Sequence, residues 1–100
     1  MLHMAVVTHG PDTCPIGSPE AMEKAMASIG QMGEAAGKLG ITVQGSWTNI
    51  PAHTLWFVLD APNGHVVNQL MIALKLQEWN TIVVHPVSTL GEAVEEIKSR

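Results

Sequence analysis

Three side chains of this sequence combine the donor types that transition metals and proton-transfer reactions use. His9 and Asp60 each end a predicted β-strand, and Cys14 follows His9 in the next loop. Imidazole and thiolate bind Zn, Ni or Cu, and a carboxylate can bind the same ion or orient the imidazole. The same His9 and Asp60 could instead form a general-base pair that moves a proton in a bound substrate. The sequence therefore indicates a divalent transition-metal site or a proton-transfer site around His9.

A second polar group is predicted at the other end of the strands. His3, early in the first strand, is expected beside His85, late in the last strand, with Thr54 nearby. Two imidazoles supply half of a metal site. We also expect Trp56, Thr54 and Gln44 to line a ligand pocket on the same surface. No nucleotide or flavin motif is present in the chain.

Every one of these candidates also has a structural interpretation. His9 could cap the turn before Pro11, and Cys14 could serve as a small apolar side chain. Asp60 could cap the turn into the next helix, and the pair of His3 and His85 could be hydrogen-bonded inside a barrel. His53 and His65 are left out of the predicted site, and core packing is expected for the methionines ahead of copper ligation.

Turn-forming residues divide the chain into four strands and three helices in the order β-α-β-β-α-β-α. Alternating apolar and polar residues predict strands at about 2–8, 41–48, 52–60 and 81–87. Apolar residues at three- and four-residue steps predict helices at about 19–38 and 65–76. Ser18 caps the first helix, and Thr89 with Glu92 forms a capping box for a last helix that packs back on the body through Leu90, Val94 and Ile97.

Alternation along each strand predicts one apolar face and one mixed face. The apolar face is assigned Leu2, Met4, Val6, Ile41, Val43, Trp47, Leu55, Phe57, Leu59, Ile82 and Val84. The mixed face carries the site candidates named above. We predict that this second face is half-buried and meets a ligand or another subunit.

The order of elements predicts a ferredoxin-like α+β domain with a four-stranded antiparallel sheet and helices on one face. In this arrangement we expect the first strand to lie centrally, parallel to the third and antiparallel to the fourth. The open face, the loop at 8–15 and the closing stretch at 85–93 resemble the dimeric α/β-barrel superfamily, as a small family within it. The resemblance implies a homodimer whose two sheets form a barrel.

The same resemblance spans several activities, which include cofactor-independent monooxygenases, muconolactone isomerases, haem-degrading enzymes, metal-binding proteins and ligand-sensing domains. It therefore implies a fold, and the function depends on the site. We expect a homodimeric protein that holds a metal ion or a small ligand in a His-lined pocket. The alternative is a cofactor-independent isomerase or monooxygenase that uses His9 and Asp60. The pocket is expected inside the barrel or between the sheet and its helices.

Length and composition limit the other classes of function. The 100 residues make one domain, with 46% hydrophobic and only 14% charged residues, so we expect a partner surface and a homodimer or higher oligomer. A net charge of -4 argues against nucleic acid as a partner. No apolar run reaches the ~20 residues that span a bilayer, and a single cysteine fits a reducing compartment, so a cytoplasmic location is expected.

Overall fold

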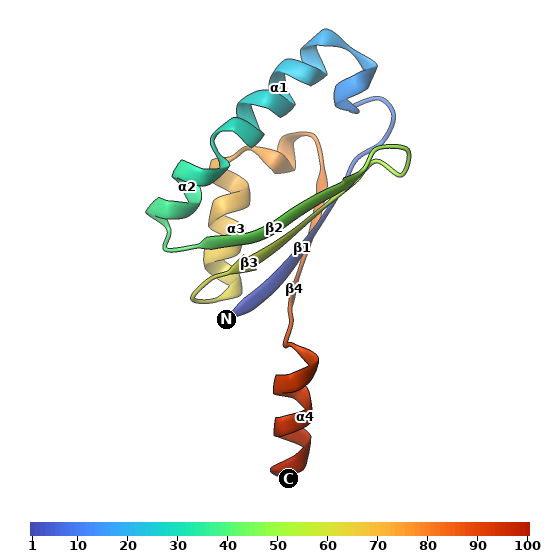
Figure 1. The fold of residues 1–100 in the computed structure, drawn as a ribbon. Coiled ribbons are helices and arrows are strands. Elements are labelled where there is room, and N and C mark those ends of the chain that lie inside the picture. The colour runs from blue at the N-terminus through green and yellow to red at the C-terminus, as the bar shows by residue number, and fades with distance from the viewer.

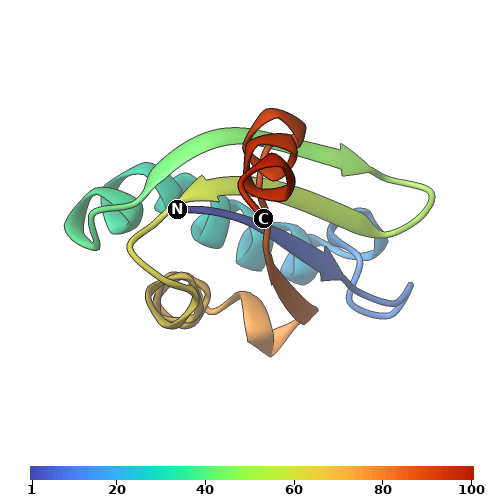
Figure 2. The same ribbon diagram turned by 90° about the horizontal axis from the view of Figure 1, so that it is seen from below.

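A four-stranded antiparallel sheet carries helices on one of its faces (Figure 1, Figure 2). The computed structural model describes residues 1–100. Its strands are β1 (Leu2–Thr8), β2 (Thr42–Asn49), β3 (Thr54–Asp60) and β4 (Thr81–Pro86). Its helices are α1 (Pro19–Gly30), α2 (Met32–Lys38), α3 (Gly64–Ala73) and α4 (Leu90–Lys98), with short 3-10 turns η1 (Pro15–Gly17) and η2 (Leu76–Glu78). The predicted α+β class is confirmed, and the arrangement is compatible with a ferredoxin-like fold.

All paired strands are antiparallel, in the order β2-β3-β1-β4. Our prediction that the first strand runs parallel to the third is wrong. The helical crossover from β1 makes β2 run in the same direction as β1, and the β2–β3 hairpin then reverses the chain. Leu2 therefore lies opposite Asp60, and Thr8 lies opposite Thr54.

Strand β1 presents the opposite face to the helices from the one predicted. His3, Ala5 and Val7 are buried beneath the helices, whereas Leu2 and Met4 are half-buried on the open face. Both alternating sets of β1 are largely apolar, so hydrophobic alternation does not distinguish its two sides.

A β-bulge between Val43 and Gly45 changes the face of the residues that follow in β2. One extra residue in a strand sends each later side chain to the other side of the sheet. Trp47, predicted on the helix-facing side, therefore lies on the open face opposite Trp56 and is 58% exposed. Its ring occupies the space that a Cβ at Gly45 would need, so a larger residue at this position would displace the Trp47 ring.

The predicted helix at 19–38 is two helices, because the chain breaks at Gln31 between Gly30 and Met32. The predicted cap is confirmed, since the Ser18 side chain accepts a hydrogen bond from the Ala21 amide at 3.1 Å. The second predicted helix is found as α3, capped by Asn63. The core lies between these helices and the sheet, and its buried residues are Ala5, Val7, Ala25, Met32, Ala36, Ile41, Phe57, Leu59, Ala61, Val67, Leu70, Met71, Leu74, Leu76 and Trp79.

Helix α4 extends from the end of β4 as a separate arm (Figure 1). The predicted N-cap is confirmed, because the Glu92 amide donates to the Thr89 hydroxyl at 3.1 Å. The predicted packing is wrong: Leu90, Val94 and Ile97 are 85%, 46% and 68% exposed. The three-residue connection after β4 directs the helix past the end of the sheet, beyond the reach of the core.

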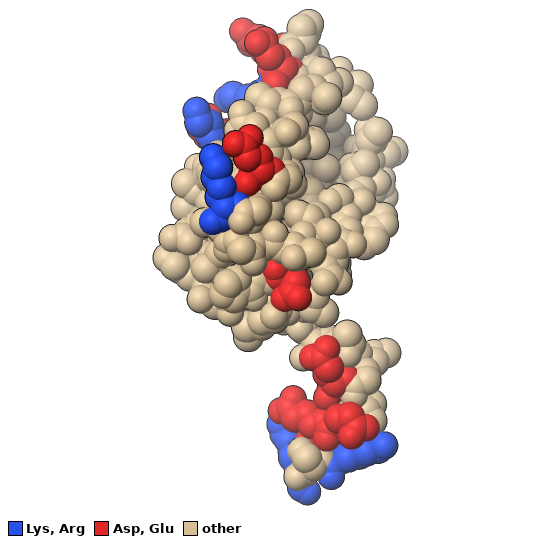
Figure 3. Space-filling view, turned by 60° about the vertical axis from the view of Figure 1, so that its left-hand side comes forward, with Lys and Arg blue, Asp and Glu red and all other residues tan.

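Charged side chains gather on α4 and on one flank of the helical layer in the view of Figure 3. Most of the remaining surface in that view carries no charge. None of the helices combines the length and the apolar character that crossing a membrane requires. The body of the domain thus leaves large uncharged areas in contact with solvent.

Candidate metal centre

The loop after β1 brings Cys14 back toward the end of that strand. The Thr13 amide donates to the Gly10 carbonyl at 3.2 Å, which closes a turn with Pro11 in its second position, where its fixed φ is favourable. Cys14 is the N-cap residue of η1, and its carbonyl accepts a hydrogen bond from the Gly17 amide at 2.8 Å. The thiol group is thereby buried, and Cys14 is only 8% exposed.

His53 reaches the same place from the β2–β3 loop. The antiparallel register sets this loop beside the end of β1, and the His9 amide donates to the His53 carbonyl at 3.1 Å. The backbone of His53 has φ 52, in the left-handed region, and its amide donates to the Ile50 carbonyl at 3.0 Å. The rings of His9 and His53 meet edge to face, with centroids 5.3 Å apart.

His9, Cys14 and His53 form a group of three metal-ligand side chains. One donor atom from each lies within 4.8 Å of the others, which is close enough to hold one ion. Tetrahedral metal–nitrogen and metal–sulfur bonds place donors about 3.3 to 3.6 Å apart. Side-chain rotations that shorten the longest separation by roughly 1 Å would complete such a geometry.

Asn80 fixes the tautomer of His9. The Asn80 amide nitrogen donates to the Leu76 carbonyl at 3.0 Å, so its oxygen faces His9 and accepts from Nδ1 at 3.0 Å. The proton of neutral His9 is therefore on Nδ1, and Nε2 keeps its lone pair. A hydrogen bond of this kind orients an imidazole for metal binding through the other nitrogen.

Two buried side-chain polar atoms in the chain have no hydrogen-bond partner, and both belong to residues of this region. They are Nδ1 of His53 and Nε1 of Trp79, whose ring lies 5.4 Å from that of His9. Buried polar atoms are nearly always paired, because an unpaired one costs about 1 to 3 kcal/mol. His53, with this unpaired ring nitrogen, belongs to the same group of three residues as the Cys14 thiol.

A cavity of about 230 Å³ adjoins the three donors. It lies between η1 and α1 on one side and the β2–β3 hairpin on the other. Apolar side chains make most of its wall, and its lining residues are His9, Cys14, Pro15, Ile16, Met22, Ala25, Met26, Ile29, Thr48, Ile50, His53, Thr54, Leu55 and Trp79. Of the two predicted pocket positions, the cavity matches the one between sheet and helices.

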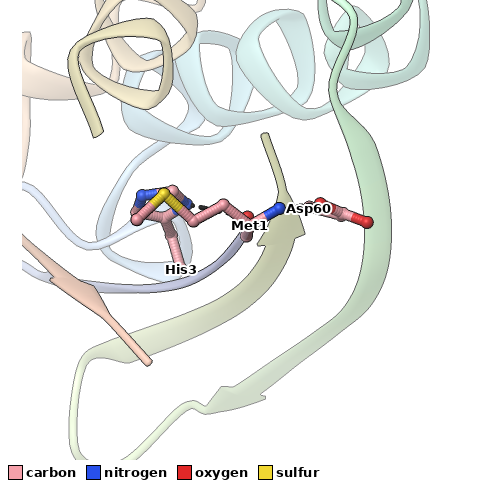
Figure 4. A network of polar contacts seen from close by, with 3 residues as sticks. All are labelled: Met1, His3 and Asp60. Carbon is pink, nitrogen blue, oxygen red and sulfur yellow. Dashed lines mark hydrogen bonds and ion pairs between the residues drawn. The ribbon is translucent and has the colours of Figure 1, made fainter. Parts of the chain in front are cut away.

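The structure brings together only part of the predicted metal and catalytic set. His9 and Cys14 are adjacent, as expected. Asp60 lies at the opposite end of the sheet, about 20 Å away along a seven-residue strand. Its carboxylate pairs with the Met1 amine at 2.6 Å (Figure 4). The predicted pair of His9 and Asp60 is therefore wrong within one chain, because β1 and β3 are antiparallel.

His3 and His85 do not form the predicted pair either. His3 lies under the helices, is 1% exposed and donates from Nδ1 to the Met1 carbonyl at 3.1 Å (Figure 4). His85 is opposite Met4 and points to the open face, where it is exposed. The inverted orientation of β1 puts the two imidazoles on opposite sides of the sheet.

The three predicted ligand-binding residues separate in the same way. Thr54 lines the cavity beside His53, with its hydroxyl donating to the Ala52 carbonyl at 2.9 Å. Trp56 is half-buried on the open face, opposite Trp47 in the strand register, and Gln44 is exposed at the bulge. Trp56 and Gln44 are therefore not part of the cavity wall.

Sequence reasoning missed His53, because its place near a hairpin end was taken to be in phase with the apolar face. The signal that could have found it was the strand direction. With β1 antiparallel to β3, the residue after β1 must lie beside the residue before β3, and these residues are His9 and His53. Asn80 was missed because a hydrogen bond across 71 positions leaves no local pattern.

The chain matches no protein-family model and no curated protein sequence. The three donors and the cavity beside them are therefore the starting point for the function.

Proposed function

We propose that this protein binds a transition-metal ion through His9, Cys14 and His53 and acts as a homodimer. The observation that carries the proposal is the meeting of two imidazoles and one thiol at a buried position, with one ring nitrogen left unpaired. Imidazole and thiolate together favour Zn, Ni or Cu over Mg or Ca, which prefer oxygen donors. A reducing compartment such as the cytoplasm keeps the single Cys14 free for this role.

A metal ion suits the site better than an organic molecule alone. The cavity of about 230 Å³ is smaller than the roughly 300 to 1,000 Å³ of most small-molecule pockets. Its wall is largely apolar, and His9, Cys14 and His53 are among the residues that line it. We infer that the metal is the principal ligand and that a small molecule enters only as a further ligand to it.

Proton transfer by His9 and Asp60 is not proposed, because the antiparallel register separates them. Where Asp60 was expected, Asn80 holds the ring of His9 by a hydrogen bond, and His53 brings a second imidazole to the site. Both of these residues favour a metal site.

The homodimer is supported by the open face of the sheet. A row of apolar side chains crosses all four strands in register, from Trp47 through Trp56 and Val6 to Val83. The four strands have six to eight residues each, so this face measures roughly 19 by 23 Å and gives a partner a continuous surface to pack against. Because no helix of the same chain covers this face, we propose that a second copy does, in the manner of the dimeric α/β-barrel proteins.

Metal analysis tests the first part of the proposal. Protein purified without an affinity tag or chelator is expected to carry Zn, Ni or Cu at about one ion per chain, or to take up one equivalent of Zn²⁺ in a calorimetric titration. Cys14→Ser is expected to abolish that uptake, and His85→Gln, on the open face, serves as the control. Failure of the folded protein to bind any of these metals would overturn the proposal.

Sedimentation analysis tests the second part. Val83→Lys places a charge in the open face and is expected to give monomers, because burial of an unpaired charge opposes association. Ile72→Lys introduces the same charge on α3 at a residue that is 61% exposed, and it should leave the dimer intact. A monomeric mass for the unchanged protein would refute the dimer and leave the metal site standing.

A further inference from the structure

Helix α1 turns two methionines toward the cavity that adjoins the donor group. Met22 and Met26 lie one helical turn apart, and both line the cavity together with His9, Cys14 and His53. They are 42% and 60% exposed, although residues of this type are usually buried. The expectation that these methionines pack in the core is therefore wrong for both.

The same stripe of α1 contains a residue that does pack in the core. Ala25 is 2% exposed, whereas Met22 and Met26 on either side of it remain open to solvent. A leucine at these two positions would supply equal apolar area. The thioether sulfur is the chemical group that distinguishes methionine at such a place, since it is a soft donor and a polarizable contact.

On this basis we propose that the site is selective for copper, bound as Cu(I), and that a thioether from Met22 or Met26 completes its coordination. This inference rests on the proposed metal-binding function and names the metal. Soft thiolate and thioether ligands select Cu(I). Copper sites are known that combine two imidazoles, one thiolate and a long bond from the metal to a methionine sulfur. Zinc also takes Cys and His ligands, so the thioether is the ligand that distinguishes copper from zinc at this site.

Binding changes protonation and leaves the oxidation states unchanged. Cu(I) forms a bond to the Cys14 sulfur, and the thiol proton leaves to solvent, so the positive charge of the ion replaces that of the proton. Nε2 of His9 already carries the lone pair that the ion needs, because the proton of the ring is held on Nδ1 by Asn80. The largely apolar wall of the cavity shields the thiolate–copper bond from water.

Parallel titrations with Cu(I) and Zn²⁺ test the proposal. Anaerobic competition with a chromophoric Cu(I) chelator measures copper affinity, and calorimetry measures zinc affinity. The variant Met22→Leu/Met26→Leu conserves volume and removes both thioethers. It is expected to weaken Cu(I) binding by about 10- to 100-fold, the scale of loss of a supporting group at a metal site, and to change Zn²⁺ affinity by less than about twofold. Met4→Leu, on the open sheet face, is the matched control.

X-ray absorption at the copper edge supplies a second readout. Two sulfur ligands are expected in the unchanged protein and one in the double variant. Unchanged Cu(I) affinity in the double variant, or one sulfur ligand in both proteins, would overturn the copper assignment. If Zn²⁺ binding then still depends on Cys14 and His53, the proposed metal-binding function stands and only the copper assignment fails. If neither metal binds, the function and this inference both fail.

Discussion

The two ends of the sheet carry similar residue types and arrange them in different ways. At one end, His9 and Cys14 from the loop after β1 meet His53 from the β2–β3 loop, and a ring nitrogen of His53 has no partner. At the other end, His3 is bonded to the Met1 carbonyl, and Asp60 is paired with the Met1 amine. Polar side chains that satisfy one another stabilise a fold, whereas unsatisfied donors at one point can receive a ligand.

The largest expected difference between the two ends is in metal affinity. Cys14→Ser and His53→Gly each remove one of three ligands, so we expect affinity to fall by more than about 100-fold, beyond the loss from a mere supporting group. Glycine also tolerates φ 52, so the fold should persist in His53→Gly. The variant His3→Gln, at the other end of the sheet, should bind metal as the unchanged protein does. Equal losses of metal affinity for variants at both ends, measured by titration calorimetry, would contradict the claim that only one end binds metal.

Removal of the support behind His9 should have the next largest effect. Asn80→Ala frees the Nδ1 proton and the ring orientation without removing a ligand. Affinity is expected to fall by about 10- to 100-fold. Asn68→Ala, at an exposed position of α3, is the control, and an unchanged affinity in Asn80→Ala would show that the hydrogen bond does not prepare His9.

At the end of the sheet where His3 and Asp60 are bonded to Met1, a substitution should change the stability of the fold. His3→Ala leaves a cavity under the helices and an unpaired Met1 carbonyl, and the free energy of unfolding is expected to fall by about 1 to 3 kcal/mol. Urea unfolding measures this change. Metal affinity at pH 7 should stay the same, and a parallel loss of affinity would mean that the two ends are coupled.

The smallest effect is expected at His85. This residue pairs with Met4 in the sheet, and its side chain is exposed on the open face. His85→Ala should alter the free energy of unfolding by less than about 0.5 kcal/mol and leave metal binding unchanged. A loss of bound metal in this variant would restore the site that the sequence predicted at His3 and His85.

The sequence predicts the elements of this fold well, because local patterns determine them. Caps at Ser18 and Thr89 and the alternation in β3 need only neighbouring residues. The face of β1 is not predicted, since both of its sides are largely apolar. The side of Trp47 depends on a bulge that shows in the sequence only as a glycine at Gly45.

The candidate site is predicted in part, for the same physical reason. His9 and Cys14 are close in the chain, and their loop is rich in turn formers. His53 and Asn80 come from segments that meet them only through strand pairing, so the direction of β3 decides whether they are found. Because β3 was predicted to run parallel to β1, Asp60 was expected beside His9 in the place that His53 occupies.

A crystal structure of the metal-loaded protein, with anomalous diffraction measured at the absorption edge of the bound metal, tests the central claim most directly. We expect one anomalous peak per chain, about 2.0 to 2.1 Å from a ring nitrogen of both His9 and His53 and about 2.3 Å from the Cys14 sulfur. A peak at His85 or Asp60, with no metal between the other three residues, would contradict the account.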